Sequence, residues 1–185
     1  PWTVILDLTD RCNLRCVMCY FSVVDQLRFE PFDRSLSDNG QMTRATFETV
    51  AERFFARARE VALACAAEPL VHKRFADLVR IAGRYRVPNL WFPTNLLALN
   101  REKAEAIVEA GVRCVAASVD GFDTETYERI RVGGRFAVLE EKLALFNDVR
   151  RGSSTRLRLI FTWMRSNRDH LLRLPDFAAK HGASE

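Results

Sequence analysis

Three cysteines near the start of the chain constrain this protein more than any other feature of its sequence. Cys12, Cys16 and Cys19 are spaced four and three residues apart, directly after an apolar run at residues 4–8. A strand that leads into a compact loop brings three sulfur atoms so spaced toward one point. Thiolates are soft ligands that select zinc, copper(I) or iron–sulfur clusters. The pattern therefore predicts a metal centre held by this loop.

The number of cysteines separates the candidate metals. Structural zinc normally has four protein ligands, and the histidine nearest to the loop in sequence is His72. Clusters held by protein alone normally take four cysteines, so three thiolates suit a four-iron cluster with one iron open for a non-protein ligand. We favour such a cluster. The alternatives are three cysteines in an ordinary loop and a zinc site completed elsewhere in the chain.

The spacing Cys-x3-Cys-x2-Cys at the end of a first strand resembles the signature of the radical S-adenosylmethionine (radical SAM) superfamily. The resemblance implies a 4Fe–4S cluster on the three cysteines, whose open iron is chelated by the amino and carboxylate groups of S-adenosylmethionine. It implies that an electron from the cluster cleaves the sulfonium, giving methionine and a 5′-deoxyadenosyl radical that abstracts hydrogen from a substrate. The resemblance further implies a small-molecule or peptide substrate and a reducing electron donor such as flavodoxin or ferredoxin.

Short apolar segments alternate with amphipathic segments along the rest of the chain. This alternation predicts an α/β fold of parallel strands with crossover helices. We expect strands at 2–8, 61–65, 90–92, 112–119 and 157–163, and helices after the N-cap Thr43 and at 75–85, 101–110, 125–130, 136–149 and 169–180. Five such units are too few for a closed eight-stranded barrel. They resemble the TIM-like partial (β/α)6 barrel of radical SAM enzymes, truncated after the fifth βα unit.

The length of the chain, 185 residues, corresponds to about one domain. We expect residues 1–185 to form a radical SAM core domain, with the first strand and cluster loop at 2–20, a long loop at 21–42 and βα units up to 182. Loops this long are uncommon unless functional or disordered, so we expect this one to cover the site. The chain begins with Pro1 rather than Met and stops where a sixth strand should begin, so we expect it to be a fragment that lacks the C-terminal remainder of its barrel.

Polar residues follow two of the predicted strands, where ligands collect in parallel sheets. Ala66-Ala67-Glu68-Pro69 is similar to the Gly-Gly-Glu-Pro segment that contacts the amino group of S-adenosylmethionine in the family, with both glycines replaced. The resemblance assigns that role to Glu68, and a helix-capping role is the alternative. Thr94-Asn95-Leu96 resembles the family's Thr-Asn-Gly segment, which makes Asn95 a ligand residue or a turn asparagine.

The fourth predicted strand ends in Ser118-Val119-Asp120-Gly121. In members with a Ser-x-Asp-Gly end, the serine contacts the ribose of S-adenosylmethionine and a downstream arginine contacts its carboxylate. Ser118 and Arg131 match these positions, and a guanidinium fork suits a carboxylate. Arg129 is the alternative arginine, and Asp120 orients the loop or faces the substrate. Such strand ends are typical of members with an additional C-terminal cluster domain.

Two residues beside the third cysteine complete the predicted cofactor site. Met18 stands where the family usually has an aromatic residue, so its backbone is expected near the adenine of S-adenosylmethionine. Tyr20 follows Cys19 and is expected to stack on the ligand.

Composition excludes several classes of protein. The net charge is +4, but the basic residues are interleaved with acidic ones, so nucleic-acid binding is not expected. No apolar run approaches the roughly 18 residues that indicate a membrane span. Five cysteines are an odd count for disulfide pairing, and free thiols with an oxygen-sensitive cluster indicate the cytoplasm.

We therefore predict an oxidoreductase-type radical SAM enzyme of unknown substrate. The alternatives are an iron–sulfur electron-transfer or sensor module that does not cleave S-adenosylmethionine, and a structural zinc-binding interaction protein. Neither alternative needs a pocket for an amine and a carboxylate beside the metal, which Glu68, Ser118 and Arg131 predict.

Overall fold

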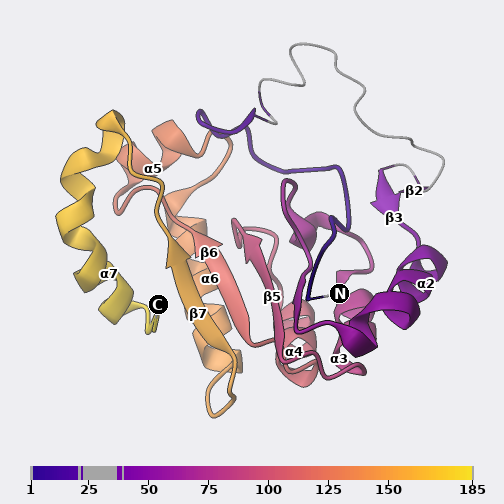
Figure 1. Ribbon diagram of the computed structural model, residues 1–185. Helices are drawn as coiled ribbons and strands as arrows, with labels where there is room; N and C mark the ends of the chain where they lie inside the picture. Colours follow the sequence, from indigo (N-terminus) through magenta and orange to yellow (C-terminus); the bar gives the residue numbers. More distant parts are fainter. Residues whose placement is uncertain (1, 21, 23–36, 39, 185) are drawn as a thin grey trace.

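Five parallel strands form the central sheet of the protein. The computed structural model describes residues 2–20, 22, 37–38 and 40–184. The sheet order follows the chain: β1 (Thr3–Ile5), β4 (Glu60–Ala62), β5 (Asn89–Thr94), β6 (Cys114–Ser118) and β7 (Arg156–Ile160). Each pair of neighbours is parallel, and Figure 1 shows β5, β6 and β7 side by side and running in the same direction. The prediction of an α/β fold built as a partial barrel is confirmed.

Helices connect the strands and cover the sheet. They are α2 (Arg44–Phe54), α3 (Phe75–Gly83), α4 (Arg101–Glu109), α5 (Thr124–Ile130), α6 (Phe136–Val149) and α7 (Leu174–Lys180), with 3₁₀ segments η2 (Phe55–Arg57), η3 (Pro69–Val71) and η4 (Arg165–Arg173). Figure 1 shows α4 and α6 behind β5 and β6, with α2 and α3 toward one end of the sheet and α7 toward the other. None of the helices described here is both long and apolar enough to cross a bilayer.

The chemistry of single residues fixes where helices begin. The Thr43 hydroxyl oxygen accepts a hydrogen bond from the Thr46 amide at 3.1 Å, so Thr43 caps α2 as predicted. Asn100 caps α4 in the same way, since its Oδ1 accepts from the Lys103 amide at 2.9 Å.

The hydrophobic core lies between the sheet and the helices. Its fully buried members include Phe92 of β5, Val115 of β6, Leu78 of α3, Ile107 of α4 and Leu143 of α6. Burying one such side chain contributes about 1.5–3 kcal/mol. The core thus fixes the strands against the helices, and with them the loops at the carboxyl edge of the sheet.

The segment after the cluster loop contains structure that periodicity did not predict. Most of the expected loop at 21–42 (residues 21, 23–36 and 39) lies outside the described residues, so its predicted covering role stays a prediction. Within the described part, β2 (Ser37–Asp38) and β3 (Gln41–Met42) form an antiparallel pair. The Met42 amide also donates to the Leu8 carbonyl at 2.9 Å. Strands of two residues are too short to show a periodic pattern.

The last predicted helix was wrong over its first half. We expected one helix at 169–180, but residues 165–173 form the 3₁₀ segment η4 and the α-helix begins only at Leu174. Pro175 explains the boundary, because proline fits the first turn of a helix, where its missing N–H has no intrahelical partner.

Candidate metal and cofactor site

A cavity of about 250 Å³ lies at the carboxyl edge of the sheet, between the loops that follow β1, β4, β5 and β6. Its lining includes eight of the residues predicted from sequence: Cys12, Cys16, Met18, Cys19, Glu68, Asn95, Ser118 and Arg131. Five segments that are far apart in sequence, including the one after α5 that carries Arg131, thus meet at one point. The predicted Tyr20 and Asp120 are not part of the lining.

The cluster loop is held against the segment that follows α5. The Arg15 amide donates to the Val132 carbonyl at 2.9 Å, and the Val17 amide donates to the Ile130 carbonyl at 3.0 Å. These two bonds flank Arg131 in the partner segment. The pairing therefore places the Arg131 side chain directly beside the cysteines.

Three N–H groups approach the cysteine sulfur atoms. Sγ of Cys12 lies 3.5 Å from the Leu14 amide nitrogen and 4.0 Å from Nδ2 of Asn95. Sγ of Cys16 lies 3.7 Å from Nη1 of Arg131. Hydrogen bonds to sulfur tune the properties of iron–sulfur clusters. The environment of the cysteines therefore fits a cluster.

Protonation and ligand spacing both bear on which metal fits. Burial raises the pKa of the Cys12 and Cys16 thiols, and at Cys16 the Arg131 guanidinium opposes the rise. Bound metal favours the thiolate form, which burial disfavours. Among the described residues, no three His, Cys, Asp or Glu side chains converge as ligands of one ion. A four-iron cluster does not require such convergence, because its cysteines bind separate irons.

Glu68 is buried and still reaches the cavity. Its Oε1 accepts from Thr94 Oγ1 at 2.7 Å and from the Leu70 amide at 3.0 Å, and its Oε2 accepts from the Asn95 amide at 2.6 Å. The bond to Leu70 caps η3, so the structural role considered from sequence is present beside the cavity position. Burial raises the pKa of Glu68, although its hydrogen bonds oppose the rise. A cationic group in the cavity favours the ionised carboxylate.

Asp120 acts on Arg131 rather than on the cavity itself. Its Oδ2 lies 2.6 Å from Nη2 and 2.7 Å from Nε of Arg131. Its Oδ1 accepts from the Thr162 amide at 2.7 Å, which ties the end of β6 to the residues after β7. The next residue, Gly121, has no room for a side chain, because a Cβ there would lie 2.5 Å from the Tyr127 amide nitrogen. Arg129, the alternative arginine, is exposed and pairs with Glu125 at 3.3 Å.

Leu96 occupies the position where the family's Thr-Asn-Gly segment has glycine. The backbone at this position has a conformation that favours glycine. Its φ is +68°, in the left-handed region that favours glycine, and its side chain is fully buried. The bend turns the chain so that Asn95 faces the cavity, where its Nδ2 donates to Asn13 Oδ1 at 2.8 Å. Ala66 and Ala67 both have negative φ, so the backbone conformation at these two positions does not require glycine.

Sequence reasoning missed Asp7 and Cys65. Oδ1 of Asp7 accepts from the amides of Cys65 at 2.7 Å, Ala66 at 3.0 Å and Ala67 at 3.4 Å. Asp7 therefore holds the loop that leads into Glu68. A charged residue within an otherwise apolar strand was the available signal. Cys65, which we expected in a strand, lies in this loop and lines the cavity.

Comparison with known proteins identifies the family. The model of the radical SAM superfamily matches residues 6–174, a range that contains the three cysteines and every predicted ligand residue. This chain belongs to the radical SAM superfamily. Radical SAM enzymes use a 4Fe–4S cluster and S-adenosylmethionine, and the donors around this cavity fit both groups.

Curated relatives share the family but are much longer. A GTP 3′,8-cyclase of Pelotomaculum thermopropionicum is 33% identical over 133 residues, which are 71% of this chain and 38% of the relative. A GTP 3′,8-cyclase of Pseudomonas putida is 29% identical over 168 residues, covering 90% of this chain and 46% of the relative. The radical SAM chain described here thus spans less than half the length of these relatives.

Solved structures share its fold. SuiB of Streptococcus suis bound to S-adenosylmethionine has a TM-score of 0.74 and 15% identity, covering 99% of this chain and 39% of SuiB. The protein anSMEcpe with bound AdoMet has a TM-score of 0.70 and 17% identity, covering 98% of this chain and 49% of anSMEcpe. Both likenesses support the radical SAM partial barrel.

Proposed function

We propose that residues 1–185 form the core domain of a radical SAM enzyme, in which Cys12, Cys16 and Cys19 bind a 4Fe–4S cluster and the adjoining cavity binds S-adenosylmethionine. The observation that carries the proposal is the convergence of three thiols, a buried carboxylate and a guanidinium on one cavity. When bound, the cluster supplies the electron that cleaves S-adenosylmethionine to methionine and a 5′-deoxyadenosyl radical, which abstracts hydrogen from the substrate.

Four polar residues of the cavity, Glu68, Asn95, Ser118 and Arg131, each have a chemically matched part of S-adenosylmethionine. Glu68 pairs with the ammonium group, because a buried carboxylate favours a cationic partner. Arg131 binds the carboxylate through N–H groups that Asp120 leaves free, and Asp120 positions it. Ser118 contacts the ribose, and Asn95 binds ligand while bridging to the cluster loop. Met18, which lines the cavity, contacts the adenine. Stacking of Tyr20 on the ligand stays a prediction, since Tyr20 lies outside the lining.

The similar proteins indicate two broad classes of substrate. The curated relatives are named for a reaction of GTP, a small molecule. SuiB has also been solved with the precursor peptide SuiA bound. We propose a small-molecule or peptide substrate, with reduced flavodoxin or ferredoxin as the electron donor.

Anaerobic reconstitution of the full-length protein with iron and sulfide tests the proposal. The protein is reduced in the presence of S-adenosylmethionine, and 5′-deoxyadenosine is quantified by chromatography. We expect a 4Fe–4S absorbance and 5′-deoxyadenosine in excess of a control without reductant. A cluster without cleavage would support an electron-transfer or sensor module instead. Zinc binding without cluster assembly would support a structural zinc protein.

A further inference from the structure

A second cavity, of about 440 Å³, lies between the segment that joins β3 to α2 and the segment that joins η3 to α3. We call it the basic pocket; its lining is Arg11, residues 41–44 and residues 72–74. Four of these eight residues are cationic, namely Arg11, Arg44, Lys73 and Arg74, and no lining residue is acidic. The basic pocket shares no lining residue with the cavity of the three cysteines.

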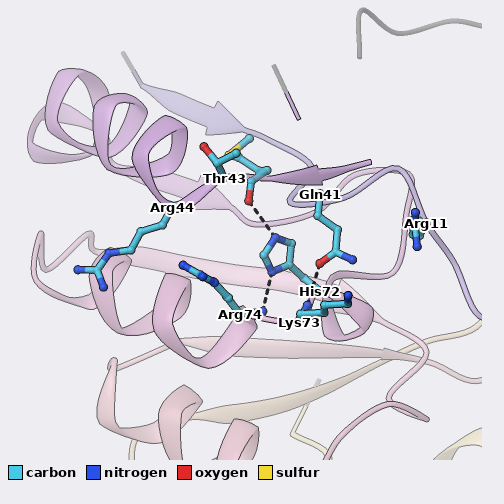
Figure 2. A pocket seen from close by; sticks show the side chains of 8 residues that line it. Arg11, Gln41, Thr43, Arg44, His72, Lys73 and Arg74 are labelled. Atoms are coloured by element: carbon cyan, nitrogen blue, oxygen red, sulfur yellow. Dashed lines mark hydrogen bonds between the residues drawn. The ribbon is translucent and has the colours of Figure 1, made fainter. Parts of the chain in front are cut away.

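Two side chains hold the walls of the basic pocket together, as Figure 2 shows. His72 Nδ1 accepts from the Arg74 amide at 3.0 Å, so the neutral ring carries its proton on Nε2, which donates to the Met42 carbonyl at 3.0 Å. Gln41 Oε1 accepts from the Lys73 amide at 2.9 Å. The pocket is therefore built in advance of any ligand.

The third wall is the segment that enters the cluster loop. The Arg11 carbonyl accepts from the Glu68 amide at 3.0 Å. Thr9, two residues earlier, pairs with Gln41 in an isolated bridge. The backbone of Arg11 is thus fixed to both the β3 and the η3 sides of the pocket.

The charged residues that line the basic pocket are all cationic. Arg44 pairs with Glu48 at 2.9 Å, whereas Arg11, Lys73 and Arg74 form no ion pair within the part of the chain that the structure describes. Both α2, which begins at Arg44, and α3, which begins at Phe75, start at this pocket, and no side chain caps α3. Helix N-termini add partial positive charge and free N–H donors. The pocket therefore favours an anion.

We propose that the basic pocket binds an oligophosphate, either a free polyphosphate or the phosphate chain of a nucleotide. Guanidinium forks bind phosphate oxygens in pairs. Arg11, Lys73 and Arg74, which have no acidic partner among the described residues, exceed the charge of one phosphate group, which is about −2, so a chain of phosphates matches them better. The volume falls in the range of small-molecule pockets, about 300–1,000 Å³. This site is additional to the proposed function and does not depend on it.

Calorimetric titration of the reconstituted full-length protein with tripolyphosphate tests the proposal. The variant is Lys73→Gln with Arg74→Gln. The control is Arg53→Gln with Arg168→Gln, which removes the same charge from exposed positions outside the pocket. We expect the pocket variant to bind tripolyphosphate at least about tenfold more weakly, because charge-assisted hydrogen bonds are lost. The control and a Lys73→Arg, Arg74→Lys variant should keep most of the affinity.

Further arms identify the ligand. ATP and GTP that bind more tightly than tripolyphosphate would indicate a nucleotide, and equal affinities would indicate recognition of the phosphate chain alone. Citrate binding as tight as that of tripolyphosphate, or an equal loss of affinity in the control, would overturn the proposal. Thermal unfolding verifies each variant, and Arg44→Gln with Lys73→Gln serves if the first pair does not fold. The 5′-deoxyadenosine assay on the same preparation tests the proposed function separately.

Discussion

Nη1 of Arg131 lies 3.7 Å from Sγ of Cys16, although 115 positions separate the two residues in sequence. The Asp120 carboxylate fixes the same guanidinium, with Oδ2 2.6 Å from Nη2. A positive charge is therefore held, nearly buried, against a candidate cluster ligand at the end of β6.

Arg131→Ala is expected to weaken S-adenosylmethionine binding by about tenfold or more, because a charge-assisted contact is lost. Iron content should be retained, since the three cysteines remain, and the cluster potential should become more negative without the nearby positive charge. Equilibrium titration, iron analysis and an anaerobic redox titration measure the three effects. Arg129→Ala is the matched control and should bind normally; unchanged affinity in Arg131→Ala would remove the assignment. Arg131→Lys is a second variant. It keeps a positive charge beside the buried Asp120, and so avoids the cost of leaving that carboxylate unpaired.

Cys16→Ala is expected to abolish cluster assembly, because two thiolates do not hold a four-iron cluster whose open iron already lacks a protein ligand. The readout is iron and sulfide content after anaerobic reconstitution. Cys65→Ala is the control, since Cys65 lines the same cavity but lies outside the cysteine motif. A Cys16→Ala protein with full iron content would contradict the ligand set.

Asp7→Ala is expected to loosen the loop at 65–67, because three amides lose their shared acceptor. The affinity for S-adenosylmethionine should fall about tenfold, because the charge-assisted contact made by Glu68 is misplaced. The iron content should stay unchanged. Asp7→Asn keeps an Oδ1 acceptor and should restore most of the affinity. If alanine and asparagine behave alike, Asp7 does not act through these hydrogen bonds.

Leu96→Gly is expected to be more stable than Leu96→Ala, by about 1 kcal/mol, because only alanine retains the strain of a left-handed backbone. Both variants should be less stable than the wild type, since a buried leucine is lost. Leu99 is also buried but has negative φ. At that position Leu99→Ala should therefore be more stable than Leu99→Gly, which is the usual order. Urea unfolding measures all four variants, and the same order at both positions would refute the strain.

The free energy of unfolding is expected to fall as the pH drops below about 6.5, the ordinary pKa of histidine. Burial lowers the pKa of His72 in the folded protein, so the unfolded chain binds more protons in that range. The stabilisation is present above the unfolded pKa and is lost as the pH falls through the folded one. Urea unfolding at pH 7.5 and 5.5 should show a smaller pH effect in His72→Gln than in the wild type. An identical effect would show that His72 does not contribute.

The alternation of strands and helices could be predicted because hydrophobic periodicity is a local property of the chain. The Thr43 cap was predictable for the same reason. The short β2–β3 pair and the 3₁₀ segment at 165–173 were not, because each depends on contacts with distant residues. Met42 pairs with Leu8, and Nδ2 of Asn167 donates to the Asp120 carbonyl at 2.9 Å.

The candidate site was partly predictable, because parallel strands bring their carboxyl ends to one edge. Sequence motifs therefore sufficed to place Glu68, Asn95 and Ser118 near the cysteines. Asp7 was missed because its partners lie 58 to 60 positions away and are backbone amides, which carry no sequence signal.

By itself, the sequence determined the cysteine spacing, the order of the βα units and the edge of the sheet where chemistry collects. Ligand spacing and periodicity are set by neighbours along the chain. Only the tertiary structure decided that Arg131 rather than Arg129 reaches the cavity, and that Asp120 holds it there. The two arginines are two positions apart on one short segment, so their roles depend on how that segment pairs with the cluster loop.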